Sequence, residues 1–276
     1  MLKDITLGQY FPGKSVLHRL DPRVKILLMI VFVVFVFLAD NAASFLYLLL
    51  VTGLLVAISR IRLSVILKGM KPVLIISIFT AVINIFWTKG EPGTALFAWK
   101  FIEIYPEGLW RALYMAIRIA SLVAGTSVLL TYTTTPMELT DALESLLSPL
   151  KKIRVPVHEF AMMMSLALRF VPTLIEETEK IINAQKARCA DFETGGLIHR
   201  AKALIPVLIP LFLSSFRRAT ELATAMECRC YTGGEGRTRM NALKLDASDL
   251  IGFFVFSLLF AGVLGCSFIP VPFGGI

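Results

Sequence analysis

The chain has 276 residues, of which 56% are hydrophobic and only 17% are charged. Soluble domains carry about 25% charged residues, so this composition excludes an ordinary soluble protein and favours an all-α membrane protein. The net charge of +8 would suggest nucleic acid as the partner of a soluble chain. Here the Lys and Arg side chains lie between apolar runs, so we interpret them as determinants of membrane orientation and expect no nucleic-acid partner.

Five apolar runs approach the roughly 20 residues that a membrane-spanning helix needs. They cover residues 24–38, 42–59, 72–87, 109–131 and 250–268. The first run is short, and residues 40–41 leave two possibilities for the first pair of runs: two spanning helices or one tight re-entrant hairpin. We therefore predict about five transmembrane helices.

The basic residues between these runs are distributed asymmetrically. Segments 1–25, 60–71 and 133–246 together hold 24 Lys and Arg, whereas segment 88–108 holds two. Because Lys and Arg concentrate in cytoplasmic loops, we predict a multi-pass membrane protein with a cytoplasmic N-terminus. The expected organisation is a membrane domain at 1–132, cytoplasmic helices at 133–246 and a last transmembrane helix at 247–276.

The long internal segment contains two further apolar runs, 155–168 and 203–216, which are interrupted by charged residues or prolines. Runs of this length are typical of buried or interfacial helices. We predict one helix from about 136 to 150 with Thr135 as its N-cap, a second from 157 to 188 and a third from 197 to 231. Charged residues on these helices, Glu144 among them, are expected to face solvent.

A short motif occurs near the end of the second and of the third predicted helix. Each copy places an arginine, Arg188 or Arg229, between small residues and shortly before a Gly-Gly pair. A single arginine there could simply complement the helix dipole. The repetition favours a second interpretation, in which each planar guanidinium is presented to a carboxylate or a groove of another protein.

These motifs carry a resemblance to a known family. Asn-Ala-Gln-Lys-Ala-Arg-Cys-Ala-Asp-Phe at 183–192, Ala-Met-Glu-Cys-Arg-Cys-Tyr at 225–231, Arg-Phe-Val-Pro-Thr at 169–173 and Asp-Pro-Arg at 21–23 resemble the T component of energy-coupling factor (ECF) transporters, a branch of the ABC transporters. In that family both arginine motifs usually read Ala-Arg-Gly. Here Cys189 and Cys230 replace Gly, and Cys228 replaces Ala.

The resemblance implies a non-enzymatic coupling subunit of a bacterial cell (plasma) membrane, without a cofactor. Two ABC-type ATPase subunits would each receive one arginine, Arg188 or Arg229, and the small neighbours Ala187, Cys189, Cys228 and Cys230 would permit close approach. ATP-driven movement would pass to a substrate-binding S component that takes up a vitamin or metal. Candidate S-component contacts are Phe160, Met164, Leu168, Val171, Leu208 and Leu211. Packing of these residues against the protein's own spans is an equal alternative.

Four other interpretations were weighed. An intramembrane enzyme acting on lipid or peptide would need His, Asp or Glu at membrane depth, and the predicted spans contain none. A conventional ABC permease would have one coupling loop per subunit and polar residues lining its spans. Residues 8–15 match the phosphate-binding loop pattern, but they lack room for a preceding buried strand, so we expect no nucleotide binding. Cys228 and Cys230 point to opposite sides of a helix, so we expect no metal site.

Arg118 lies inside a predicted span, where a charge is costly and usually paired.

Overall fold

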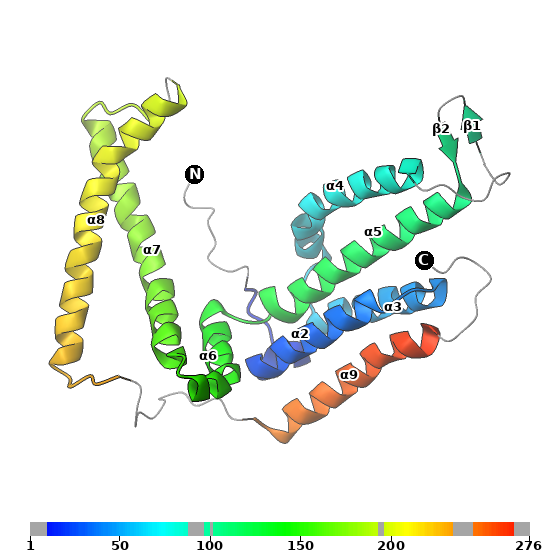
Figure 1. Ribbon diagram of the computed structural model, residues 1–276. Coiled ribbons are helices and arrows are strands. Elements are labelled where there is room, and N and C mark those ends of the chain that lie inside the picture. Colours follow the sequence, from blue (N-terminus) through cyan, green and yellow to red (C-terminus); the bar gives the residue numbers. More distant parts are fainter. Residues whose placement is uncertain (1–9, 88–96, 100–101, 193–195, 234–244, 268–276) are drawn as a thin grey trace. The chain divides into compact units, whose positions relative to one another are not determined.

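The computed structural model describes residues 10–87, 97–99, 102–192, 196–233 and 245–267 (Figure 1). Within these residues the chain forms two compact units. The first contains residues 10–139 and 245–267, and the second contains residues 140–233. The described structure is almost entirely helical, as the apolar runs predicted.

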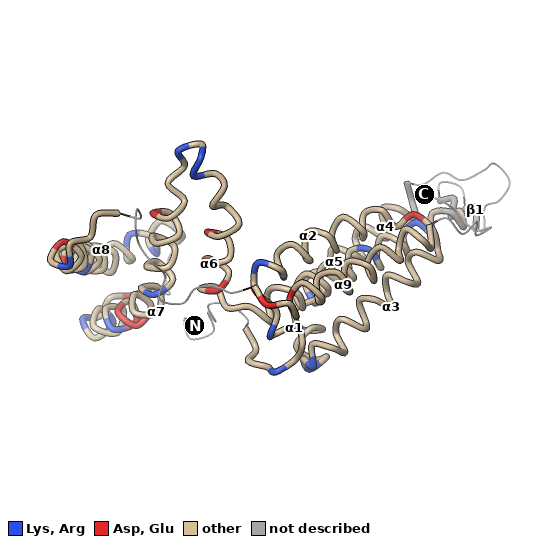
Figure 2. The backbone as a smooth tube through the Cα atoms, turned by 90° about the horizontal axis from the view of Figure 1, so that it is seen from below, with Lys and Arg blue, Asp and Glu red and all other residues tan. Residues whose placement is uncertain are grey.

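The first unit is a bundle built from α2 (Pro22–Phe37), α3 (Ala42–Ser59), α5 (Pro106–Thr126) and α9 (Ala247–Ser267), with α4 (Leu63–Trp87) lying along α5 (Figure 1). A π-helical turn, Ser127–Thr131, continues α5, and the short α1 (Val16–Arg19) precedes α2. Charged residues lie mainly toward the helix ends, and few interrupt the apolar stretches between them, Arg118 of α5 being one (Figure 2). This distribution suits helices whose middles face lipid or one another.

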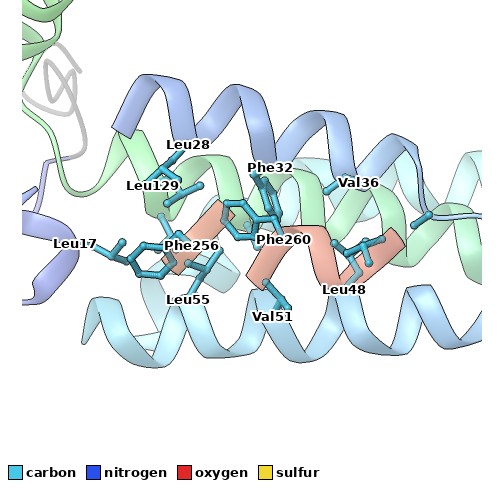
Figure 3. Close-up of a cluster of buried hydrophobic side chains, with 14 of the residues drawn as sticks. Leu17, Leu28, Phe32, Val36, Leu48, Val51, Leu55, Leu129, Phe256 and Phe260 are labelled. Carbon is cyan, nitrogen blue, oxygen red and sulfur yellow. The ribbon is translucent and has the colours of Figure 1, made fainter. Parts of the chain in front are cut away.

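The core of this bundle joins residues from both ends of the sequence. Phe32 of α2 packs against Phe260 of α9 with ring centroids 5.2 Å apart, and Val51 and Leu55 of α3 lie in the same cluster (Figure 3). Gly125 of α5 is necessary at its position because a Cβ atom there would overlap the Phe32 ring. Close packing of this kind holds helices together in lipid, where the hydrophobic effect does not act between them.

Buried polar groups join the first turns of α2 and α9. Asp21 caps α2, and its own N–H donates to the Asp249 carboxylate at 3.0 Å. Asp249 also accepts from the N–H of Asp246 at 3.0 Å, which caps α9. The Lys25 ammonium is almost completely buried and donates to the Thr133 carbonyl at 2.9 Å. Every one of these groups has a partner, as buried polar groups require.

Two segments between the apolar runs contain regular structure that the apolar pattern did not predict. Residues 60–71 are not a loop, because α3 is capped by Arg60 in a left-handed conformation (φ 56°) and α4 begins at Leu63. Pro72 therefore lies inside a helix, which membrane helices tolerate. Between α4 and α5, strands β1 (Phe97–Trp99) and β2 (Ile102–Ile104) form an antiparallel pair.

Five described helical segments are long and apolar enough to cross a membrane. They are Ala42–Ser59, Leu63–Ile85, Gly108–Thr131, Ile198–Glu227 and Ala247–Ser267. The number matches the prediction, but one member differs. The predicted first span forms α2, which has only 16 residues, and the segment in α8 was expected to be too interrupted by proline to qualify.

Arg118 of α5 has a partner that the sequence did not reveal. Its guanidinium donates to the Ala39 carbonyl in the turn between α2 and α3, and it lies 3.9 Å from the Asp40 carboxylate. It also stacks on the Phe45 ring, 5.3 Å from the ring centre. The charge inside α5 thus fixes the turn that joins the first two long helices.

The second unit contains the end of α6 (Pro136–Leu146), the 3₁₀ helix Ser148–Ile153, α7 (Val157–Ala187) and α8 (Leu197–Glu227). The N-terminus of α6 is a reciprocal capping box: Glu138 N–H donates to Thr135 Oγ1, and Thr135 N–H donates to the Glu138 carboxylate. The α-helix ends at Leu146 rather than at 150 because the 3₁₀ turn takes over.

Glu144 does not face solvent as expected. It is buried, and its carboxylate lies 3.0 Å from His158 Nδ1, so it ties α6 to the first turn of α7. Farther along, α7 and α8 pack as an antiparallel pair (Figure 1). Arg218 donates to Glu177 at 2.7 Å, and Gln185 Nε2 donates to the Pro206 carbonyl at 3.4 Å.

Candidate functional site

The C-terminal end of α7 carries the first arginine motif. Arg188 is the last residue before Cys189, which adopts a left-handed conformation with φ 63°. Two backbone bonds close this end: Ala190 N–H donates to the Gln185 carbonyl at 3.0 Å, and Cys189 N–H donates to the Lys186 carbonyl at 3.0 Å. This pair of bonds is the Schellman motif, which satisfies carbonyls that a helix end would leave unpaired.

The C-terminal end of α8 repeats the same geometry. Arg229 directly precedes Cys230, which is also left-handed with φ 53°. Tyr231 N–H donates to the Met226 carbonyl at 3.0 Å, and Cys230 N–H donates to the Glu227 carbonyl at 2.9 Å. The two arginines therefore occupy equivalent positions in two equivalent helix ends, which explains the sequence repeat as a structural one.

This geometry explains the residue after each arginine. A positive φ is costly for any side chain except that of glycine, and Cys189 and Cys230 both adopt one. Sequence reasoning attributed the preference for a small residue there to close approach of a partner. The backbone supplies a different reason, since the chain must reverse directly after the arginine. The Ala-Arg-Gly pattern of the resembled family could have indicated this conformation, because glycine stands there at the left-handed position.

All the residues assigned to the two helix ends are exposed. They are Ala187, Arg188, Cys189, Cys228, Arg229 and Cys230. Neither Arg188 nor Arg229 forms a side-chain hydrogen bond or ion pair with another described residue. Each guanidinium is therefore free to bind a group from outside this part of the chain. Its position at a helix C-terminus is also favourable for a cation.

The two arginines lie at opposite ends of the α7–α8 pair. Gln185 contacts Pro206, so the Arg188 end of α7 is level with the first turns of α8. Arg229 follows the other end of α8, more than twenty residues farther along. At 1.5 Å per residue this separates the two helix ends by roughly 35 Å. One small groove cannot hold both arginines, whereas two separate sites can.

The residues considered for S-component contact lie on α7 and α8. Phe160, Met164 and Leu208 are 62%, 42% and 50% exposed, whereas Leu168, Val171 and Leu211 are partly buried. The exposed apolar surface of α8 also includes Phe212 and Phe216, whose rings lie 5.9 Å apart. These side chains are available to a lipid or protein surface, and their assignment to an S component stays a prediction.

The phosphate-binding loop pattern lies partly outside the described residues, which begin at Tyr10. In the part that is described, Ser15 Oγ lies 2.6 Å from His18 Nδ1 and starts the single turn α1. Phe11 N–H pairs with the Tyr132 carbonyl at 3.1 Å. Among the described residues, no three His, Cys, Asp or Glu side chains are grouped so as to hold a metal ion.

Comparison with known proteins agrees with this architecture. Residues 13–240 match the family described as CbiQ, cobalt transport protein. A protein of Clostridium kluyveri is 54% identical over 251 residues, which is 91% of this chain and 92% of that protein. One of Ruminiclostridium cellulolyticum is 55% identical over 251 residues, with the same two coverages, and one of Bacillus subtilis is 46% identical over 249 residues, 90% and 93% of the two chains.

Each of these relatives is named energy-coupling factor transporter transmembrane protein EcfT. The apolar helical bundle and the match to a transport family define a membrane component of a bacterial transporter. The chain belongs to the family of energy-coupling factor transporter transmembrane proteins, the T components of ECF transporters. It is therefore one component of a transporter complex, and a conventional ABC permease is not favoured.

Proposed function

We propose that this T component transmits the movement of two ABC-type ATPase subunits to a separate substrate-binding S component, and that it has no catalytic site of its own. The equivalent ends of α7 and α8 carry the proposal. Two equivalent arginine-bearing helix ends roughly 35 Å apart suit a pair of like subunits, each of which offers one groove. Closure of the ATPase pair on ATP would then pull or tilt α7 and α8.

Each arginine would be held by charge and shape together. The chain reverses at Cys189 and Cys230, so each preceding arginine lies at the end of its helix, where its side chain is exposed. A guanidinium binds a carboxylate through two parallel hydrogen bonds, and lysine cannot reproduce that geometry. An acidic groove on each ATPase would therefore recognise Arg188 and Arg229 specifically.

The membrane orientation of the proposal has the N-terminus and the arginine-bearing helix ends in the cytoplasm. The excess of Lys and Arg in segments 1–25, 60–71 and 133–246 supports it. In this arrangement α2 crosses together with α3, α4, α5 and α9, and residues 38–39 extend the short α2. Helix α8, of whose apolar segment only 6% is buried, would lie at the membrane surface with its apolar face against lipid or the S component.

The experiment replaces both arginines with glutamate. The R188E/R229E variant, expressed with its transporter partners in native membranes, should lose co-purification of the ATPases, because two attractive contacts become repulsive. K180E is the matched control, since Lys180 is an exposed cation on α7 away from the helix end. Subunits that co-purify are identified by mass spectrometry, and uptake is measured with a panel of labelled vitamins and divalent metal ions.

The expected result is loss of ATPase association and of uptake in R188E/R229E, with both retained in K180E. R188K/R229K should retain part of the association, because the charge remains and the paired hydrogen bonds do not. Full association and uptake in the double glutamate variant, at normal protein levels, would refute the proposal. Equal loss in K180E would also count against it, because the effect would then follow from charge alone.

A further inference from the structure

A basic cavity lies in the first unit where α3 ends. It has a volume of about 620 Å³, and its lining includes Lys14, Arg19 and Arg60. A second cavity of about 300 Å³ adjoins the same residues Lys14 and Arg60 and adds Arg62. The coupling role uses none of these residues.

The three cations of the larger cavity are not neutralised. Lys14, Arg19 and Arg60 are exposed, and none of them has a side-chain hydrogen bond or ion pair with another described residue. All the side chains described as lining this cavity are basic, hydroxyl-bearing or apolar. The three positive charges repel one another. An anion that binds among them is attracted by all three and relieves this repulsion.

One wall of the cavity is apolar and continues along α3. Ala57 and Ile58 line the cavity, and Ala57 shares one face of the helix with Leu46, Leu50 and Gly53. All four residues of that face are exposed. A Cβ atom added at Gly53 would meet no atom within 4 Å, so the face is open at its centre.

The length of this apolar face is close to the thickness of one bilayer leaflet. From residue 46 to residue 57 it runs roughly 16 Å at 1.5 Å per residue. The hydrocarbon of one leaflet is about half of the 30 Å core of a bilayer. An exposed strip of this length that ends at three cations matches an acyl chain and its phosphate. A free phosphate ion would make no use of the strip.

We propose that the cavity at the end of α3 binds an anionic phospholipid of the leaflet in which α3 ends. The phosphate lies among Lys14, Arg19 and Arg60, and one acyl chain lies along Leu46, Leu50 and Gly53. An anionic headgroup is favoured over a zwitterionic one because three positive charges meet no acidic side chain in the described lining. Anionic lipids attract basic residues at the membrane surface in the same way.

The test uses native mass spectrometry of the full-length protein released from nanodiscs that contain equal amounts of phosphatidylglycerol and phosphatidylcholine. Wild-type protein should retain phosphatidylglycerol at least about tenfold over phosphatidylcholine. K14Q/R19Q/R60Q should lose this preference. K151Q/K152Q/R154Q removes the same number of exposed charges, two in the 3₁₀ helix of the second unit and one at its C-cap, and should retain the preference.

Two further arms keep the test decisive. R60G removes one cation at a position whose left-handed φ suits glycine, so the helix end is preserved and the preference should fall partly. G53W blocks the apolar strip and should weaken retention with all three cations in place. Displacement of the lipid by millimolar inorganic phosphate, or full preference in K14Q/R19Q/R60Q, would overturn the proposal.

Discussion

Replacement of Cys189 by glycine should stabilise the end of α7. Cys189 has φ 63°, and a left-handed residue other than glycine costs about 1–2 kcal/mol. Glycine removes this cost, but it also adds conformational entropy to the open form, by about 0.5–1 kcal/mol. The net stabilisation of the closed helix end is therefore expected to be roughly 1 kcal/mol, which corresponds to about a fivefold change in its opening equilibrium.

Amide hydrogen exchange measures this opening directly. The N–H groups of Cys189 and Ala190 are bonded to the carbonyls of Lys186 and Gln185, and they exchange when the helix end opens. In C189G both amides should exchange about fivefold more slowly, after correction for the intrinsic rates of the new sequence. In C189V they should exchange faster, because a β-branched side chain fits a positive φ poorly.

The second helix end serves as the internal control. It lies roughly 35 Å away, so the amides of Cys230 and Tyr231 should exchange at unchanged rates in both single variants. If C189G and C189V leave exchange at residues 189 and 190 unaltered, the left-handed Schellman end is not what holds the chain reversal. Coupling should survive C189G, because Arg188 keeps its position before the reversal.

Two substitutions in the membrane bundle should behave differently from their neighbours in thermal unfolding of the purified protein. G125A introduces a Cβ atom against Phe32 and should destabilise the bundle by about 1–3 kcal/mol. G265A, whose new Cβ has no atom within 4 Å, should be neutral or slightly stabilising. Equal unfolding temperatures for the two variants would contradict this packing. R118M removes the charged hydrogen bond to the turn between α2 and α3 and should lower the free energy of unfolding by about 1–3 kcal/mol. R111M, which alters an exposed cation of the same helix, should leave the unfolding temperature unchanged.

Much of the helical layout follows from local sequence. Pro at the first position of α6 and the Thr135–Glu138 pair identify the start of that helix, and both are confirmed as its N-terminal signals. The starts of α7 and α8 at Val157 and Leu197 agree with the predicted starts. These features are encoded within a few residues, so sequence reasoning can reach them.

Other elements depended on distant residues. Arg118 had no partner in sequence because its acceptor, Ala39, lies 79 positions away in the turn between two other helices. Glu144 was expected to face solvent, but it is buried against the start of α7, where His158 lies in contact with its carboxylate. Such pairs arise from the packing of helices against one another, so the sequence of a single helix cannot predict them.

The sequence by itself determined the class of protein, since apolar runs of membrane length and a one-sided distribution of Lys and Arg need no tertiary contact to act. It also determined that Arg188 and Arg229 form a matched pair. The folded backbone decided how each arginine is presented, through a positive φ and helix-end bonds that close within six residues. Only the tertiary structure, the antiparallel packing of α7 and α8, decided that the two arginines lie far apart, because no feature of either helix alone fixes how the pair is aligned.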